Sequence, residues 1–134
     1  MSTEPEFPAT LSPWLNVRDS RKALDFYKTA FGAKEIFLLD DEDKGVLARF
    51  CIGASEFWMS DESPEHGNFS PETIGGCSVR LILIVQDPDA VFAQAIAAGA
   101  TQVCPMTDDH GWRVGRIADP FRHIWEIGRK VSNS

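Results

Sequence analysis

This chain of 134 residues lacks several features that would place it in a familiar class of protein. No apolar run reaches the roughly 18 residues that a membrane-spanning helix needs. The acidic stretch from Met1 to Pro8 lacks the basic-then-apolar order of a secretory signal peptide. Acidic residues outnumber basic ones by 20 to 13, and the net charge of −7 argues against nucleic acid and anionic membranes as partners. We therefore expect a cytoplasmic protein that binds neither.

Cysteine and histidine are also scarce, with three residues of each. The odd number of cysteines and the lack of a CxxC pair favour reduced, buried thiols over a disulfide framework. No two histidines stand at a spacing typical of metal ligands, and no Ser-His-Asp, P-loop or GxGxxG arrangement is present. The apolar share of 43% is ordinary, so the length predicts one globular domain with a core of its own.

What the chain does contain is an internal repeat. The stretch from Val17 to Gly32 is similar to the stretch from Val85 to Gly99, and both read as a helix opened by an aspartate and closed by a glycine. Residues 49–58 likewise match residues 116–125 at a constant offset of 67. Such a repeat usually means two copies of one supersecondary unit that share a core. Positions that differ between the copies are candidates for a functional site.

Each copy predicts one helix and four strands. In the first copy, apolar residues recur at helical spacing after the cap at Asp19 or Ser20. A charged turn at residues 40–45 separates the strand that follows this helix from the later strands of the copy. The result is an α+β fold of two β-α-β-β-β modules. We expect a loose arm over residues 1–9, a single domain over 10–130, a first module over about 10–60, a connector over 61–76 and a second module over about 77–130.

Several segments resemble the vicinal-oxygen-chelate superfamily, which includes glyoxalase I, bleomycin resistance proteins and extradiol dioxygenases. They are residues 15–19, 23–27 and 31–33, and the closing segment Asp119-Pro120-Phe121-Arg122-His123-Ile124-Trp125. Residues 70–76 are similar to the PhnB-like branch in particular. The resemblance implies that the eight strands form an open cup with the helices outside. It also implies a homodimer in which a second subunit completes the cup.

In metal-dependent members of this superfamily, four inward side chains hold one divalent ion. The resemblance places these positions at Ser12, Met59, Arg80 and Glu126. Only Glu126 suits a hard metal ion, because Met59 is a soft thioether and Arg80 is a permanent cation. We therefore expect no metal and no other cofactor.

Arg80 and Glu126 would place opposite charges where the metal ion would otherwise lie. The pair either fills the vacated site or uses Arg80 to contact an anionic or carbonyl group of a ligand, with Glu126 orienting it. Strand alternation extends this site along one face of the cup. The predicted ligand-binding residues are Trp14, Asn16, Phe57, Met59, Arg80, Ile82 and Glu126, whereas Trp58 and Trp125 are predicted to face the helices in the core.

These features predict a glyoxalase- or bleomycin-resistance-like protein that binds a small molecule in the cup without a metal. The alternative is an enzyme of the same superfamily, a lyase, isomerase or dioxygenase, with a non-standard site. The sequence identifies no catalytic residue. His123 is expected to serve structure rather than ligation, since it precedes the last strand and is oriented away from Glu126.

Overall fold

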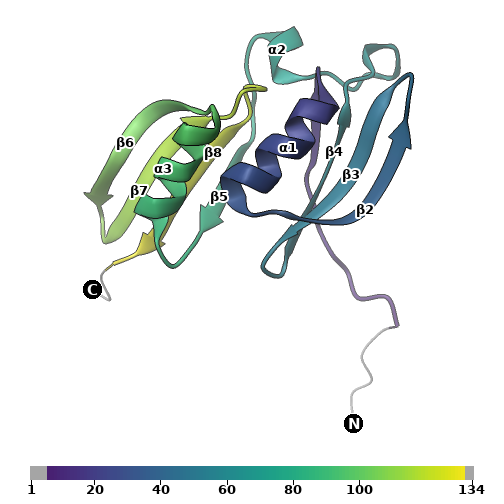
Figure 1. The fold of residues 1–134 in the computed structure, drawn as a ribbon. Helices are drawn as coiled ribbons and strands as arrows, with labels where there is room; N and C mark the ends of the chain where they lie inside the picture. The colour runs from purple at the N-terminus through teal and green to yellow at the C-terminus, as the bar shows by residue number, and fades with distance from the viewer. Residues whose placement is uncertain (1–5, 132–134) are drawn as a thin grey trace.

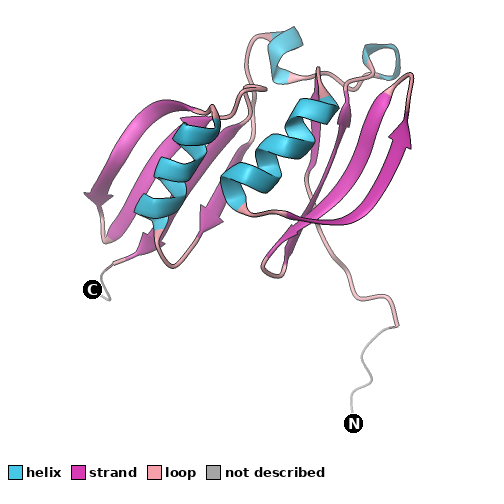
Figure 2. Cartoon of the chain, viewed as in Figure 1, coloured by secondary structure: helices cyan, strands magenta, loops and turns pink. Residues whose placement is uncertain are grey.

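The computed structural model describes residues 6–131 and confirms the predicted α+β fold of two β-α-β-β-β modules, which lie side by side (Figures 1 and 2). The first five positions of the predicted N-terminal arm lie outside the described residues. The connector holds a short 3-10 turn, η1 (Pro64–His66), and one turn of helix, α2 (Pro71–Ile74). The modules consist of β1 (Trp14–Val17), α1 (Ser20–Phe31), β2 (Lys34–Asp41), β3 (Gly45–Ile52) and β4 (Ser55–Asp61), then β5 (Arg80–Ile84), α3 (Pro88–Ala98), β6 (Thr101–Asp109), β7 (Trp112–Ala118) and β8 (Ile124–Lys130).

Both modules build the same four-stranded sheet. The strand order is β1-β4-β3-β2 in the first sheet and β5-β8-β7-β6 in the second. In each sheet the first strand pairs in parallel with the last strand, and the remaining neighbours are antiparallel. The repeat in the sequence is therefore a repeat of topology.

The helix limits follow the predicted signals. Asp19 caps α1 by accepting a hydrogen bond from the backbone N–H of Lys22, and Gly32 ends it with a positive φ of 64°. Asp87 caps α3 in the same way through the N–H of Ala90. Pro88 fits the first turn because its missing N–H had no helical partner there.

The helices cover one face of each sheet and also contact each other (Figure 1). Their buried side chains form one core that crosses from module to module. The Trp125 ring of β8 lies 4.4 Å from Phe31 of α1 and 5.8 Å from Phe57 of β4, measured between ring centroids. Tyr27 is fully buried between these rings. Within the described part of the chain no helix covers the opposite face of either sheet, and we call it the free face.

A buried carboxylate joins the two modules. Asp119, at the turn between β7 and β8, accepts hydrogen bonds from the hydroxyl of Tyr27 at 2.5 Å and the indole N–H of Trp125 at 3.0 Å. The backbone N–H groups of Phe121 and His123 donate to its other oxygen. Burial raises the pKa of the Asp119 carboxyl, and it also raises the pKa of the Tyr27 hydroxyl. Because every donor finds an acceptor, this buried polar group adds specificity to the module contact.

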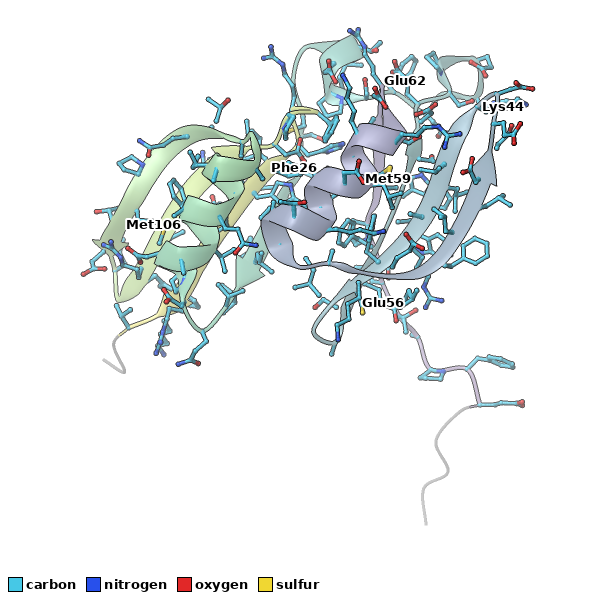
Figure 3. The ribbon with its side chains drawn as sticks, viewed as in Figure 1. Phe26, Lys44, Glu56, Met59, Glu62 and Met106 are labelled. Atoms are coloured by element: carbon cyan, nitrogen blue, oxygen red, sulfur yellow. The ribbon has the colours of Figure 1, made fainter. Side chains whose placement is uncertain are left out.

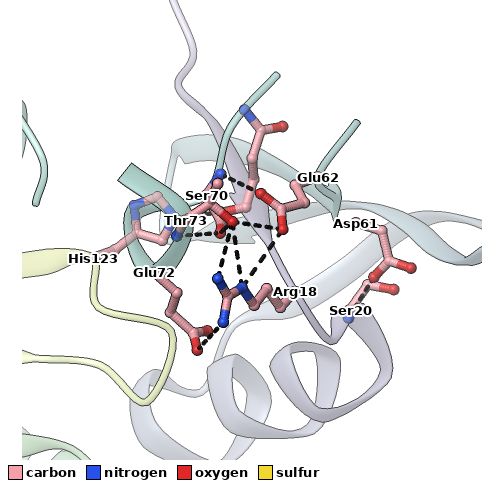
Figure 4. A network of polar contacts seen from close by, with 9 residues as sticks. Arg18, Ser20, Asp61, Glu62, Ser70, Glu72, Thr73 and His123 are labelled. Atoms are coloured by element: carbon pink, nitrogen blue, oxygen red, sulfur yellow. Dashed lines mark hydrogen bonds and ion pairs between the residues drawn. The ribbon is translucent and has the colours of Figure 1, made fainter. Parts of the chain in front are cut away.

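A second polar cluster fixes the connector to the ends of β1 and β4 (Figure 4). The Arg18 guanidinium lies 3.6 Å from Glu62 and 3.9 Å from Glu72. The backbone N–H of Ser70 and the hydroxyl of Thr73 both donate to Glu62. The Ser70 hydrogen bond is the main reason that the pKa of Glu62 lies below its usual value.

The edge strands differ from the sequence prediction. β6 is the outer strand of the second sheet, and all of its residues except the half-buried Met106 are therefore exposed. The prediction of buried thiols is accordingly wrong for Cys104 and Cys77, which are exposed, while Cys51 is half-buried. Within residues 6–131 no helix is long and apolar enough to cross a membrane.

Candidate functional site

The two free faces present equivalent positions with different side chains. Strand pairing places Trp14, Trp58 and Arg49 in one row across the first sheet. The equivalent row of the second sheet contains Ile82, Glu126 and Arg116. Only the arginine is common to both rows. The free faces therefore differ in chemistry, whereas the core faces of both sheets bury apolar side chains.

The free face of the first module is an aromatic platform formed by Trp14 and Trp58. Their rings stack at 5.4 Å with an interplanar angle of 5°, and the Arg49 guanidinium lies 5.3 Å from the Trp58 ring centroid. The Trp14 indole N–H donates to the hydroxyl of Ser60 at 2.9 Å, which fixes the ring orientation. Trp14 is nevertheless 46% exposed. Glu56 forms an ion pair with Arg49 and balances its charge.

The free face of the second module carries a charged cluster of Arg80, Arg116 and Glu126. The Nε of Arg80 lies 2.9 Å from Oε1 of Glu126, and Nη2 of Arg116 lies 2.6 Å from the same oxygen. The Nε of Arg116 is buried without a hydrogen-bond partner. Beside the cluster on β5, Ile82 and Ile84 are exposed. The cluster holds two positive charges and one negative charge.

The structure corrects the predicted orientation of β4. Phe57 and Met59 were expected in the cup, but both are buried on the helix side, and Met59 lies under α1 (Figure 3). Trp58, predicted in the core, lies on the free face instead. Trp125 does lie in the core, as predicted.

The physical reason is a difference of one residue in loop length. Four residues separate the paired positions Cys51 and Glu56, whereas five separate the equivalent Ala118 and Ile124. A shift of one residue moves every side chain of a strand to the other face. Glu126 is therefore equivalent to Trp58, although the two tryptophans of the repeat match at an offset of 67. The sequence signal that could have shown this register is the difference in length between the β3–β4 loop and the β7–β8 loop.

Asn16 and Ser12 lie together with Trp14 at a cavity between the modules. Its volume is about 680 Å³, which is within the usual range for small-molecule sites. Leu81 lines it from β5, and the connector contributes further apolar residues. The His123 ring also lines it and lies 2.9 Å from the carbonyl oxygen of Asn16. The connector contributes Phe69, Pro71 and Ile74, and the segment before β5 contributes Cys77, Ser78 and Val79.

The divalent ion of the superfamily does not fit the residues at this site. Arg80 and Arg116 both form ion pairs with Glu126, and their two guanidiniums would repel a metal ion. The first module offers Trp58 where the second has Glu126, and an indole ring is not a metal ligand. Across residues 6–131 no group of three or more His, Cys, Asp or Glu side chains could hold a metal ion.

Comparisons with known proteins identify the family of this chain. Residues 9–127 match the model of the Glyoxalase/Bleomycin resistance protein/Dioxygenase superfamily. An uncharacterized protein of Mycobacterium tuberculosis is 38% identical over 126 residues, covering 90% of this chain and 74% of that protein.

Two solved structures show the same fold. The X-ray structure of an Arabidopsis thaliana gene product is 28% identical with a TM-score of 0.70, covering 90% of this chain and 98% of that one. The genomically encoded fosfomycin resistance protein FosX from Listeria monocytogenes, complexed with Mn(II) and sulfate ion, is 16% identical with a TM-score of 0.70 and covers 92% and 91% of the two chains. The chain therefore belongs to the glyoxalase/bleomycin resistance protein/dioxygenase superfamily.

Proposed function

We propose that this protein binds a small organic molecule without a metal ion. Its ligand stacks on the tryptophan platform and extends toward the adjoining cavity. The observation that carries the proposal is the exposed indole of Trp14, stacked on Trp58 and oriented by Ser60. A rigid, exposed aromatic surface beside a cavity of suitable volume is typical of a site for a flat, apolar molecule.

The enzymatic alternative has less support from the residues of this chain. The central strands of the two free faces offer Glu56 and Glu126 as carboxylates, and arginines already engage both of them. A general base needs to be free to reach the proton that it removes. FosX binds Mn(II), but at 16% identity it shares only the fold with this chain. We therefore assign no lyase, isomerase or dioxygenase activity.

The proposed binding protein is a homodimer in the cytoplasm and belongs to the PhnB-like branch. Four consecutive apolar residues of β2, from Ile36 to Leu39, are exposed on the outer strand of the first sheet. An exposed apolar edge strand is typical of an interface. A second copy of the chain would cover it and close the cup. The branch assignment is supported by the resemblance of residues 70–76, and the cytoplasmic one by three cysteines without a disulfide.

The binding test uses 2-naphthamide, a flat neutral probe, followed by ligand-observed NMR. We expect binding to the unmodified protein and a loss of about tenfold or more in Trp14→Ala, because base-sized rings gain roughly 1–3 kcal/mol from stacking on an aromatic side chain. Trp112→Ala is the matched control, since Trp112 is 41% exposed but lies away from the cavity. Equal binding by Trp14→Ala and the unmodified protein would contradict the proposal.

The dimer test is sedimentation equilibrium at micromolar concentration. A dimer has twice the 14.9 kDa mass of the chain. Leu39→Lys places a charge on the exposed apolar surface of β2 and is expected to shift the protein toward the monomer. A clean monomer for the unmodified protein would rule out the homodimer.

A further inference from the structure

We infer that the ligand of the proposed site is a carboxylic acid whose carboxylate is bound by Arg80 and Arg116. The inference rests on the proposed function, including the dimer that closes the cup, because neither arginine lines the cavity beside Trp14 within a single chain. It adds the chemical class of the ligand. It follows from the charge, the exposure and the unused donors of the cluster on the second free face.

The cluster carries an excess of positive charge. Two guanidiniums share a single oxygen of Glu126, at 2.9 and 2.6 Å, so the cluster keeps one positive charge in excess. In the first module Arg49 forms an ion pair with Glu56, and this pair has no net charge. A ligand with one negative charge would neutralise the second cluster, whereas a cationic ligand would add to the repulsion.

The two arginines are more exposed than the carboxylate that they share. The Arg80 and Arg116 side chains are 55% and 35% exposed, whereas Glu126 is only 18% exposed. The carboxylate of Glu126 thus lies beneath the guanidiniums and holds them together. A molecule that approaches the free face meets the two cations before it meets the anion.

The two guanidiniums also have hydrogen-bond donors that Glu126 does not use. A guanidinium has five N–H donors in a fixed fork, and a carboxylate accepts two of them in parallel. Arg80 uses its Nε for Glu126 and leaves its terminal nitrogens without a protein acceptor among the described residues. Arg116 uses one Nη, and its buried Nε has no partner. The buried Nε cannot reach a ligand, so the unused terminal N–H groups are the donors that give an incoming carboxylate charge-assisted hydrogen bonds.

The residues beside the cluster indicate the chemistry of the rest of the ligand. Ile82 and Ile84 extend along β5 from Arg80 and are exposed, so the acid is expected to carry an apolar body. A free inorganic anion would leave this apolar surface unused. An aromatic or other apolar carboxylate matches both parts of the surface.

The experiment compares two probes of nearly the same shape, 2-naphthoate and 2-naphthamide, on the intact protein. We expect 2-naphthoate to bind about tenfold more tightly, the ratio that corresponds to one charge-assisted hydrogen bond. Arg80→Met and Arg116→Met are each expected to remove most of this preference. Glu126→Gln is expected to strengthen binding of 2-naphthoate alone, because it removes the competing carboxylate. A misfolded variant could not produce such a gain.

The matched control is Arg113→Met, which changes the net charge by the same amount. Arg113 comes from the same strand as Arg116 but pairs with Asp89 of α3 on the helix side, at 2.7 Å. It is expected to leave the preference unchanged.

The outcomes separate the two proposals. Equal affinity for both probes, or a preference that survives in Arg80→Met and Arg116→Met, would overturn the acid as ligand while leaving small-molecule binding intact. Failure of both probes to bind would overturn the proposed function and this inference with it.

Discussion

The two free faces show which part of a repeated fold changes most readily. Arg49 and Arg116 occupy the same position in both sheets, yet one lies over an aromatic ring and the other shares a carboxylate with a second arginine. On the core side, by contrast, both modules bury apolar side chains under a capped helix. A core position is restricted by its neighbours, whereas a free face needs only to keep the strands paired. The difference makes the second face a charged site and the first an aromatic one.

The largest expected effect on stability concerns Asp119, a buried polar residue whose equivalent in the first module is the apolar Ile52. Asp119→Ala is expected to lower the free energy of unfolding by about 4 kcal/mol, because four donors lose their acceptor in the core. The equivalent Ile52→Ala is expected to cost about 1–2 kcal/mol, since Ile52 is only half-buried. Chemical denaturation measures both. A smaller loss for Asp119→Ala than for Ile52→Ala would contradict the structural role of the carboxylate.

The second prediction tests the corrected register of β4. Met59→Ala is expected to destabilise the protein by about 3 kcal/mol, because the side chain is fully buried. Trp58→Ala is expected to cost less stability but to weaken binding of 2-naphthamide, because Trp58 supports Trp14 on the free face. Thermal or chemical denaturation and the NMR titration together distinguish the two faces. If Met59→Ala weakened binding and left stability unchanged, the original assignment of Met59 to the cup would be restored.

A smaller effect is expected from the carboxylate that the two arginines share. Glu126→Gln is expected to lower stability by about 1 kcal/mol, since two neighbouring guanidiniums then face each other without a counter-charge. Adding Arg80→Met should recover most of this loss. Glu56→Gln, the comparable change in the first module, leaves only Arg49 on the Trp58 ring and should cost less. Double-mutant denaturation measures the coupling, and additive losses would show that the three charges do not interact.

The smallest effect is a pH dependence that belongs to the first module. Because the folded protein holds the pKa of Glu62 below its usual value of 4.5, chiefly through the Ser70 N–H, it favours the ionised carboxyl. The stability that Glu62 contributes is complete above pH 4.5 and is lost as the pH falls through the lowered folded pKa. Glu62→Gln is expected to reduce stability at neutral pH and to flatten the acid limb of the profile. The equivalent end of β8 carries the cations Arg129 and Lys130 in place of a carboxylate. An unchanged acid limb in Glu62→Gln would exclude this role.

The sequence predicted the fold well because its signals are local. Asp19, Gly32 and Asp87 mark helix limits through hydrogen bonds to residues within a few positions. The two β-α-β-β-β modules were likewise expected from the repeated pattern and the resemblance to a known family. The helix limits depend little on contacts between distant parts of the chain, whereas the strand order also needs the parallel pairing of β1 with β4 and of β5 with β8.

The site was predicted less completely because it depends on register and on distant contacts. The matching tryptophans at positions 58 and 125 suggested one alignment, and a single extra loop residue between β7 and β8 produced another. Arg116 was missed because its place beside Arg80 follows only from the pairing of β7 with β8. The cavity depends on Phe69 and Ile74 of the connector, whose fold no periodic pattern predicts. The net charge of −7 also gave no sign of the local excess of positive charge.

The link between the two modules has a consequence for the order in which the chain folds. Tyr27 and Asp119 are 92 residues apart in the sequence, and His123 reaches the carbonyl of Asn16 across 107 residues. Closing loops of that length costs chain entropy before the contacts can repay it. The hairpins and the two capped helices depend on short loops, so they can form early in the folding reaction. The carboxylate of Asp119 then finds Tyr27 only when the halves dock, so we expect that docking to be a late event of folding.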